Sequence, residues 1–474
     1  MRVLLVLHFF LPRHSAGTEV YTDSIARALR ERGHDVHLFF TEKVLSRHNY
    51  TLERRDWHGI PCHVLTNNLL YESFDETFTN PEVERQFRVV LDETKPDVVH
   101  VQHVMLLSMG LPAIAKERGI PVLMTLHDFF LACARFGQLL EHGERVCSGP
   151  EPKKCANCMA DFKFAQTRFQ QRMISAIRWT KNVAGFDLAP VVDVLRGLPL
   201  VRGGGGEPES SEPGEAADRA RRARVDSFAP LFKRRAKAFL ALARHVDRFL
   251  APSRTVREGM TAFGLSKRKI HVLPLGIEMP PHAERRRREH DEVVFGFIGT
   301  LAPHKGVHVA IEAMRYMKGH GRLLVFGRRD YYPDYVARLE QLAQGLNVEL
   351  KGPVPRRDLA KAFAQIDVLV VPSIWFENFP IVIQEARAAG VPVVASNLGG
   401  MAEAVRHDVD GLLFPPGDAK ALARTFAVLV HDRTAIERMR AAAPVPLTLA
   451  AHVDRVEDEL RALVDRHRVS EVRT

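Results

Sequence analysis

The feature that most constrains the fold of this chain is an alternation of short apolar runs with longer stretches of helical periodicity. Parallel strands are buried on both faces and are joined by crossover helices, so their sequences read in this way. The pattern predicts an α/β protein built on doubly wound parallel sheets. In the first half of the chain, the predicted strands are Val3–Phe9, Asp35–Phe40, Pro61–Leu65, Val98–Gln102 and Val122–Leu126.

A second series of strands begins at Val293 and indicates a second domain of the same class. We expect the boundary near residues 275–292, with an N-terminal domain over residues 1–275 and a C-terminal domain over residues 276–450. Residues 451–474 should contain a closing amphipathic helix. The strands of the second series are VVFGFIG, RLLVFG, VELKG, VLVVPS, VPVVAS and GLLFPPG, and the closing helix carries Val453, Val456, Leu460 and Leu463 on one side.

Residues 200–224 interrupt this pattern. They contain four consecutive glycines followed by Pro, Ser and Glu and then by mixed charge. Such a segment buries too little apolar surface to offset the entropy lost on ordering. The sequence therefore predicts a disordered insertion here, with a helix resuming over Lys233–His245.

Composition and charge narrow the class of protein. Hydrophobic residues make up 46% of the chain, no apolar run is long enough to span a bilayer, and MRVLLVLHFFLP lacks a small-residue cleavage site. We interpret this segment as a buried first strand of a cytoplasmic protein. The net charge of +10 gathers in patches such as Lys233–Arg235 and Arg285–Arg288. No nucleic-acid module has a recognisable spacing. The basicity favours a phosphate-bearing substrate or an anionic membrane surface.

The basic helix over residues 231–245 has two interpretations. Its Lys and Arg residues alternate with Phe and Leu, which suits a helix lying on the anionic inner face of a membrane beside a lipid-linked acceptor. A helix that simply packs its apolar side against the protein is the interpretation that the sequence favours.

Candidate site residues follow the predicted strands, where open α/β sheets bind their ligands. Gly17 follows the first strand, His127 and Asp128 follow Val122–Leu126, and Lys305 stands in a turn before a helix. A helix N-terminus with a nearby lysine suits a diphosphate. Each residue also has an ordinary interpretation, as a turn glycine, a hydrogen-bonded loop histidine or a solvated lysine.

The stretch WFENFPIVIQEARAA, residues 375–389, places Glu377 in a loop and Glu385 in the helix that follows. Carboxylates accept hydrogen bonds from vicinal diols such as those of ribose and hexose. The backbone amides of residues 378–382 can face a diphosphate, with Pro380 at the first helical position. An acidic helix start favoured by the macrodipole is the alternative interpretation.

As an ordered set, these motifs resemble the retaining glycosyltransferase family 4. The resemblance rests on E-x7-E, on G-x-L-x3-K-G from Gly299 to Gly306, on the turn at Leu398–Glu403, and on AGTE, GHDV, PDVVHVQH, LHDFF, APS and LPLGIE. It covers the chain except for roughly residues 160–230. It implies a GT-B fold with a nucleotide-sugar donor held between two Rossmann-like domains, mainly by the C-terminal one. It also implies that the closing helix crosses back to the N-terminal domain.

The resemblance assigns roles residue by residue. Glu385 would bind the ribose diol, Glu377 the hydroxyls of the transferred sugar, and Lys305 the diphosphate. Gly17 would lie beneath the diphosphate and His127 near the reaction centre. The residues expected to be catalytic are His127, Glu377 and Lys305, and those expected to bind the donor are Gly17, Thr300, Lys305, Asn378, Phe379, Pro380, Ile381, Glu385, Gly399 and Gly400.

The chain departs from the family pattern at two positions. Thr300 stands where the family often has Arg, so one phosphate cation is missing or comes from elsewhere, with His304 and Arg328 as candidates. Pro380 stands where the family often has Gly, which removes one amide from the phosphate cradle.

Four of the five cysteines, Cys133, Cys147, Cys155 and Cys158, fall within one short segment. C-x2-C with two further cysteines nearby is compatible with a structural zinc site, which Lys153 and Lys154 would assist by favouring thiolates. The gaps between the other cysteines match no common zinc finger. Four reduced, unpaired thiols therefore remain the alternative.

Taken together, the sequence predicts transfer of a hexose from a UDP- or GDP-sugar to an acceptor hydroxyl with retention of configuration. The setting expected is cell-surface polysaccharide or glycolipid biosynthesis, with the nucleotide sugar as co-substrate and no catalytic metal or other cofactor. Two alternatives stay open. A nucleotide-sugar epimerase shares the architecture and would convert donor without an acceptor, and a catalytically inactive nucleotide-sugar-binding protein would do neither.

Overall fold

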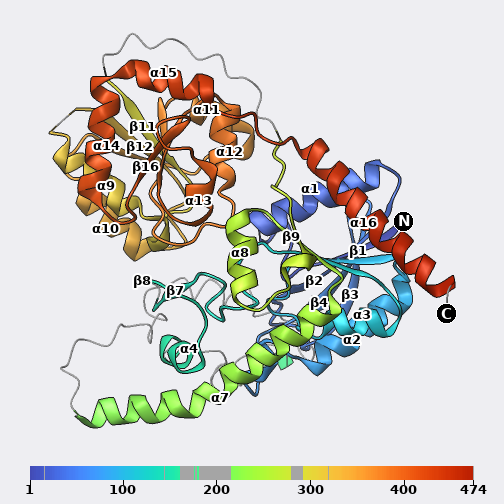
Figure 1. The fold of residues 1–474 in the computed structure, drawn as a ribbon. Helices are drawn as coiled ribbons and strands as arrows, with labels where there is room; N and C mark the ends of the chain where they lie inside the picture. Colours follow the sequence, from blue (N-terminus) through green and yellow to red (C-terminus); the bar gives the residue numbers. More distant parts are fainter. Residues whose placement is uncertain are drawn as a thin grey trace.

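The computed structural model folds into two α/β domains, shown in Figure 1 with the first in blue to green and the second in yellow to orange. It describes residues 1–14, 16–142, 145–160, 176, 179–180, 215–278, 292–318 and 320–472. The basic run Arg285–Arg288 and residues 200–214 of the predicted insertion lie outside the described residues.

The N-terminal domain is built on an eight-stranded sheet with the order β10-β9-β6-β5-β1-β2-β4-β3. Its strand pairs are parallel except for the antiparallel β3–β4 pair at one edge. The bounds are β1 Arg2–Val6, β2 Asp35–Glu42, β3 Leu52–Trp57, β4 Ile60–Thr66, β5 Val98–Val101, β6 Val122–Thr125, β9 Arg248–Ala251 and β10 Ile270–Val272.

Helices cover this sheet and link its strands. The regular helices are α1 Gly17–Glu31, α2 Pro81–Thr94, α3 Leu111–Glu117, α4 Pro152–Cys158, α7 Glu215–His245 and α8 Arg254–Ala262. The described part of the domain also contains short 3-10 turns, η1 Asp75–Thr77 and η3 Lys267–Lys269, and a small β7 (Leu140–Glu141)–β8 (Arg145–Val146) ribbon.

The five strands predicted for the first half are confirmed as β1, β2, β4, β5 and β6, with ends within a few residues. The sequence analysis did not predict β3. Its sequence LERRDW is mostly exposed and carries little apolar signal. Pairing with β4 holds this strand at the edge of the sheet, which is why a propensity argument alone does not find it.

The C-terminal domain is built on a six-stranded parallel sheet in the order β13-β12-β11-β14-β15-β16. The six runs predicted in this half are its six strands, so a GT-B-like pair of doubly wound domains is confirmed. The strands are β11 Val294–Ile298, β12 Arg322–Phe326, β13 Val348–Gly352, β14 Val368–Val371, β15 Val393–Ser396 and β16 Gly411–Phe414. The helices and 3-10 turns are η4 Pro303–Lys305, α9 Val307–Tyr316, α10 Pro333–Ala343, η5 Arg356–Asp358, α11 Leu359–Phe363, α12 Ile381–Ala388, α13 Gly399–Ala404, α14 Ala419–His431 and α15 Arg433–Ala442.

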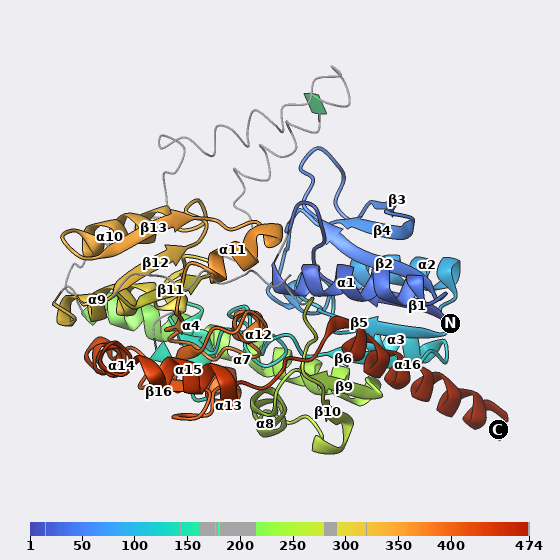
Figure 2. The ribbon, with the colours of Figure 1, turned by 90° about the horizontal axis from the view of Figure 1, so that it is seen from above.

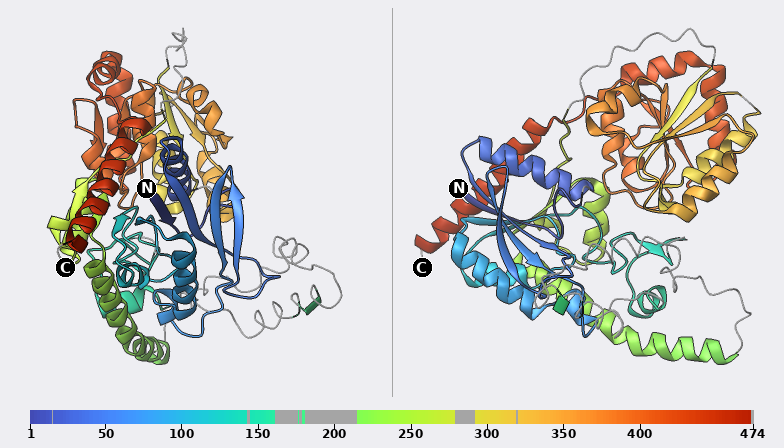
Figure 3. Two further views of the ribbon diagram at one scale, coloured as in Figure 1. Left: turned by 90° about the vertical axis from the view of Figure 1, so that its right-hand side faces the viewer. Right: turned by 180° about the vertical axis from the view of Figure 1, so that it is seen from behind.

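The chain passes between the domains twice, and the two passages are hydrogen-bonded to each other. Ile277 N donates to Leu447 O at 3.0 Å and Leu449 N donates to Ile277 O at 2.9 Å. Helix α16 (Leu449–Val472) then lies along the N-terminal domain, beside α1, in Figures 1, 2 and 3. Its buried residues Val453, Val456, Leu460 and Leu463 share one core with strands β1 and β2.

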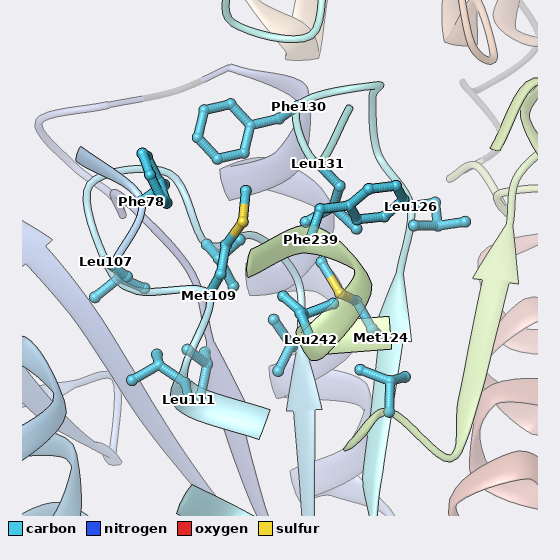
Figure 4. Close-up of a cluster of buried hydrophobic side chains, with 14 of the residues drawn as sticks. Phe78, Leu107, Met109, Leu111, Met124, Leu126, Phe130, Leu131, Phe239 and Leu242 are labelled. Carbon is cyan, nitrogen blue, oxygen red and sulfur yellow. The ribbon is translucent and has the colours of Figure 1, made fainter. Parts of the chain in front are cut away.

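Helix α7 corrects part of the predicted insertion. It begins at Glu215, so residues 215–224 are helical rather than disordered. Its second half packs Phe232, Phe239 and Leu242 into the core of the N-terminal domain, next to side chains such as Met109 and Phe130 (Figure 4). The apolar side of residues 231–245 is therefore used for packing within the protein. Among the described helices, none has the length and apolar composition needed to cross a bilayer.

Candidate active site

Three neighbouring strands of the C-terminal sheet, β11, β14 and β15, each lead into predicted site residues. Lys305 follows β11 in the turn η4, Glu377 follows β14, and Gly399 and Gly400 follow β15 at the start of α13. Because the carboxyl ends of parallel strands lie at the same edge, the fold brings these loops together.

Lys305 and Glu377 form an ion pair at this edge. Lys305 Nζ lies 2.6 Å from Glu377 Oε1, and Ser373 Oγ donates to the same oxygen at 2.7 Å. Glu377 is only 7% exposed. Burial on its own disfavours the carboxylate, but the charge of Lys305 and the hydrogen bonds from Lys305 and Ser373 outweigh it and lower the pKa of Glu377. Glu377 is thus held as an anion that accepts hydrogen bonds.

Gly306 allows the loop of Lys305 to touch the loop of Glu377. Its φ is +67°, and a Cβ at this position would stand 1.9 Å from the carbonyl oxygen of Pro372. Next to it, Ile374 N donates to His304 O at 2.9 Å and joins the two loops. A side chain at position 306 would push them apart, and with them Lys305 and Glu377.

Two of the glycines predicted to bind the donor, Gly399 and Gly400, pack directly against the Glu377 loop. Gly400 N donates to Glu377 O at 2.7 Å, and a Cβ on Gly400 would lie 2.6 Å from the carbonyl oxygens of both Glu377 and Asn378. The glycines at 399 and 400 therefore permit close packing of two loops. A contact of their own with a donor remains a prediction.

Glu385 lies on α12, at a distance from this pair, and faces an arginine. Its carboxyl group is 8% exposed, and Arg356 Nη1 of η5 lies 3.5 Å from Glu385 Oε1. Burial raises the pKa of Glu385, and Arg356 opposes that effect. Arg356 Nε also lies 3.5 Å from Glu278 Oε2 in the segment that links the domains. The sequence analysis did not single out Arg356.

The structure describes Thr300 and the two residues, His304 and Arg328, that were candidates to replace the missing phosphate cation. Thr300 is exposed in the loop after β11. Burial, and then the charge of Lys305, lower the pKa of His304 to about 4, so without a bound anion this imidazole is neutral at pH 7. Arg328 is exposed and is paired with Asp330, Nε to Oδ1 at 3.0 Å.

The N-terminal domain presents polar side chains after its adjacent strands β6, β5 and β1. His127 Nε2 lies 2.9 Å from Gln102 Oε1, and burial followed by repulsion from His103 lowers the pKa of His127 to about 3. The imidazole is therefore neutral. Asn378 Nδ2 donates to His127 O at 2.8 Å across the domains. This bond brings the predicted reaction-centre histidine next to the Glu377 loop.

The remaining predicted donor residues also meet the N-terminal domain. Pro380 is the N-cap of α12 rather than its first residue, with φ −70° and ψ 95°. Phe379 and Ile381 pack against the core that contains β1 and α16. Gly17 begins α1, and a Cβ built on it would meet no atom within 4 Å. The protein itself does not fill the space at this helix start.

Three polar residues of the N-terminal domain, His8, Glu19 and His103, were not assigned to the site from the sequence. His8 Nε2 lies 3.3 Å from Glu19 Oε1, and His103 Nε2 lies 3.0 Å from Oδ2 of Asp128, which the sequence analysis had named. Each follows a strand or opens α1, so position after a strand was the available signal. Within the described residues, four buried polar atoms in this region have no hydrogen-bond partner: His8 Nδ1, Glu19 Oε2, Gln102 Nε2 and Asn378 Oδ1. Such atoms are rare in a dry core and are suited to a polar ligand.

The four clustered cysteines lie away from these residues. Cys133, Cys147, Cys155 and Cys158 are free thiols that line one cavity of about 20 Å³. Within the described part of the chain, no three Cys, His, Asp or Glu side chains are spaced as metal ligands. The predicted zinc site is therefore not formed as a ready ligand set.

Both halves of the chain match known protein families. Residues 16–154 match the model described as "Glycosyl transferase 4-like domain", and residues 280–445 match "Glycosyl transferases group 1". The amylovoran biosynthesis glycosyltransferase AmsK of Erwinia amylovora is 30% identical over 46% of this chain and 54% of its own length. A GDP-mannose-dependent alpha-mannosyltransferase of Mycobacterium tuberculosis is 32% identical over 41% of this chain and 51% of its own. The chain thus spans about half the length of the curated relatives it matches.

Solved structures resemble the whole chain in fold. Sucrose-phosphate synthase from Thermosynechococcus elongatus has a TM-score of 0.63 with 17% identity and covers 98% of this chain and 99% of its own. HepE of Anabaena, in complex with UDP and glucose, has a TM-score of 0.58 with 17% identity and covers 97% of this chain and 99% of its own. At this identity the likeness establishes the fold.

Proposed function

We propose that this chain is a glycosyltransferase of the GT-B fold that transfers a hexose from a nucleotide diphosphate sugar to an acceptor hydroxyl with retention of configuration. The observation that carries the proposal is the meeting of Lys305, Glu377 and the His127 loop where the domains touch. The GDP-mannose donor of one relative and the UDP bound to HepE support a nucleotide-sugar donor. The polysaccharide role of AmsK supports a polysaccharide or glycolipid acceptor.

Lys305 would neutralise the donor diphosphate. Its ammonium stands beside the start of α9, where free backbone N–H groups and the helix dipole also favour a phosphate. The open space at Gly17, at the start of α1, gives the diphosphate a second helix N-terminus. Stabilising the leaving diphosphate in this way lowers the barrier to breaking the bond between sugar and phosphate.

The acidic residues would orient the two ends of the donor. Glu377, held ionised, would accept hydrogen bonds from hydroxyls of the transferred sugar, and Glu385 would accept them from the ribose diol. His127 is neutral, so its ring would act near the sugar by hydrogen bonding rather than by charge. The unpaired atoms Asn378 Oδ1 and Gln102 Nε2 provide further groups for hydroxyls of donor or acceptor.

A donor and acceptor screen tests the proposal. The purified chain is incubated with a panel of UDP- and GDP-sugars and with sugar or glycolipid acceptors, and products are identified by mass spectrometry. We expect an acceptor-dependent product whose anomeric configuration, read by NMR, equals that of the donor. Donor conversion to an isomeric nucleotide sugar without acceptor would favour an epimerase. Donor binding without any turnover would contradict transfer.

A further inference from the structure

Four cysteines surround one small cavity in the N-terminal domain. The cavity of about 20 Å³ lies among the β7–β8 ribbon, the segment that follows it and α4, and all four of Cys133, Cys147, Cys155 and Cys158 line it. In Figure 1, this region stands beside α7. A volume close to that of a single probe sphere admits one ion and excludes a multi-iron cluster. The fifth cysteine, Cys62, is buried in β4, elsewhere in the domain.

The chain presents the four sulfurs from three directions. Cys155 and Cys158 are three residues apart on α4, so they lie on the same side of that helix. Cys133 comes from the loop before the ribbon and Cys147 from the residue directly after β8. Two ligands from one helical turn and two from separate loops can surround a point, as tetrahedral zinc requires.

Backbone N–H groups already point at these sulfurs. His142 N donates to Cys158 Sγ at 3.3 Å, and Gly149 N donates to Cys147 Sγ at 3.4 Å. Burial raises the pKa of the Cys133 thiol, and hydrogen bonds from backbone groups of Leu139 and Arg135 oppose this effect. An N–H donor stabilises a thiolate more than a thiol, because the hydrogen bond is then charge-assisted. Such donors around several sulfurs orient and stabilise metal-bound cysteines.

Two cations balance the charge that such a site would carry. A divalent ion with four thiolates leaves two negative charges. Arg235 of α7 is 4% exposed and directs its guanidinium to backbone carbonyls of the loop before Cys133, including Leu131 O at 3.0 Å. Lys154 lines the cavity itself. This buried arginine donates its hydrogen bonds to carbonyls, and its guanidinium also lies 5.1 Å from the centre of the Phe130 ring, so it would gain an anionic counterpart if the thiols bound a metal as thiolates.

Two of the thiols donate hydrogen bonds to backbone carbonyls. Cys147 Sγ donates to Gly149 O at 3.4 Å and Cys158 Sγ donates to Leu140 O at 3.7 Å. A thiolate cannot donate, so binding a metal would remove these two bonds and leave the N–H donors in place. The described thiols line the cavity without standing at ligand spacing, so metal binding would require the sulfurs to turn toward the cavity by rotation about χ1.

We propose that Cys133, Cys147, Cys155 and Cys158 bind one Zn²⁺ as a tetrathiolate. The four thiols release four protons, and four Zn–S bonds form without any change of oxidation state. With four protein ligands the ion has no open position, so its role is structural. Cys133 lies shortly after His127 and Asp128, and Arg235 holds the loop between them. The ion would therefore fix the loop that carries His127 at the domain contact.

Metal analysis of the purified chain tests the proposal directly. The protein is expressed with zinc, purified under reducing conditions without chelator, and assayed for metals by mass spectrometry. We expect about one zinc per chain. Cys155→Ser and Cys158→Ser should each lose most of it, while the matched control Cys62→Ser, a buried cysteine outside the cluster, should keep it. Less than about a tenth of an equivalent in the wild type would overturn the proposal, as would iron as the sole bound metal.

Cobalt gives a readout that does not depend on activity or on the folding of the variants. Wild-type protein stripped of metal by a thiol-blocking mercurial, then reduced and given Co²⁺, should show the strong visible absorption of tetrahedral cobalt with thiolate charge-transfer bands. An octahedral cobalt spectrum, or disulfides among these cysteines in freshly purified reduced protein, would overturn it. The zinc content and the cobalt spectrum can be measured whether or not the protein turns over a donor. These two measurements therefore test the metal site separately from the proposed transfer.

Discussion

Lys305 Nζ lies 2.6 Å from Glu377 Oε1, and this pair joins the two residues expected to hold different parts of the donor. The same ammonium lies 5.1 Å from the centre of the Trp375 ring, which fixes its direction. In the proposed donor complex, a diphosphate and Glu377 would therefore compete for Lys305. If the phosphate takes the ammonium, Glu377 would be released to accept sugar hydroxyls, which would couple donor binding and sugar orientation at one atom pair.

The first prediction concerns the charge of Lys305. Lys305→Ala should lower kcat/KM for transfer about 100-fold or more, because one preorganised charge on the leaving diphosphate is typically worth ~3 kcal/mol. Steady-state kinetics with the donor found in the screen measures this. Lys267→Ala, an exposed lysine on η3, should keep the wild-type rate. A folded Lys305→Ala protein with near-normal kcat/KM would contradict the assignment.

The second prediction concerns the stability that Glu377 contributes. Its pKa is lowered in the folded protein, so the carboxylate stabilises the fold above the unfolded value near 4.5, and this contribution is lost as the pH falls through the lower folded pKa. Glu377→Gln should therefore unfold at a lower temperature than the wild type at pH 7, and the gap should close toward pH 4 and below. Glu258→Gln, an exposed glutamate on α8, should show no such trend. If the difference in melting temperature between Glu377→Gln and the wild type widened on acidification, the pKa of Glu377 would not be lowered in the folded protein.

The third prediction concerns Arg356 and the predicted ribose carboxylate. Burial raises the pKa of Glu385 and Arg356 opposes this, so Arg356→Ala should raise that pKa further. Protonated Glu385 accepts fewer hydrogen bonds, so the KM for donor should rise several-fold as the pH is lowered toward the raised pKa of Glu385, and the rise should begin at a higher pH than in the wild type. Arg357→Ala is the matched control, since its neighbouring side chain is 87% exposed. Parallel pH profiles of the donor KM for Arg356→Ala and Arg357→Ala would show that Arg356 does not affect donor binding through Glu385.

The fourth prediction separates steric contact from backbone strain at Gly306. Gly306→Ala combines a positive φ with a Cβ 1.9 Å from Pro372 O, whereas Gly345→Ala has φ +73° and no neighbour within 4 Å. The strain alone costs about 1 kcal/mol, so Gly345→Ala should lower the melting temperature slightly and leave activity intact. Gly306→Ala should lower it more and reduce transfer, because the loops of Lys305 and Glu377 are forced apart. Equal effects of the two substitutions on transfer would contradict this account.

Local sequence patterns predicted most of the secondary structure. Most of the six C-terminal runs and five N-terminal runs are strands because they are apolar enough to be buried in a parallel sheet, whereas β13 (VELKG) is only partly buried and is paired with β12. The edge strand β3 escaped prediction because its sequence is polar and its pairing with β4 is tertiary. The first ten residues of α7 escaped for a related reason, since Ala and Arg there carry helix propensity while the preceding glycines dominated the interpretation.

The sequence by itself determined which residue types follow each strand, and hence that Lys305, Glu377, Glu385 and His127 would lie at carboxyl edges of the two sheets. Local periodicity and turn chemistry are sufficient for that, because parallel topology places those edges together. Only the tertiary structure decided which atoms meet. The Lys305–Glu377 bond, the Arg356–Glu385 contact and the Asn378–His127 bond join residues far apart in the chain. The pKa shifts of Glu377, Glu385 and His127 follow from burial and from charged neighbours. Neither the burial nor the neighbours can be read from sequence spacing.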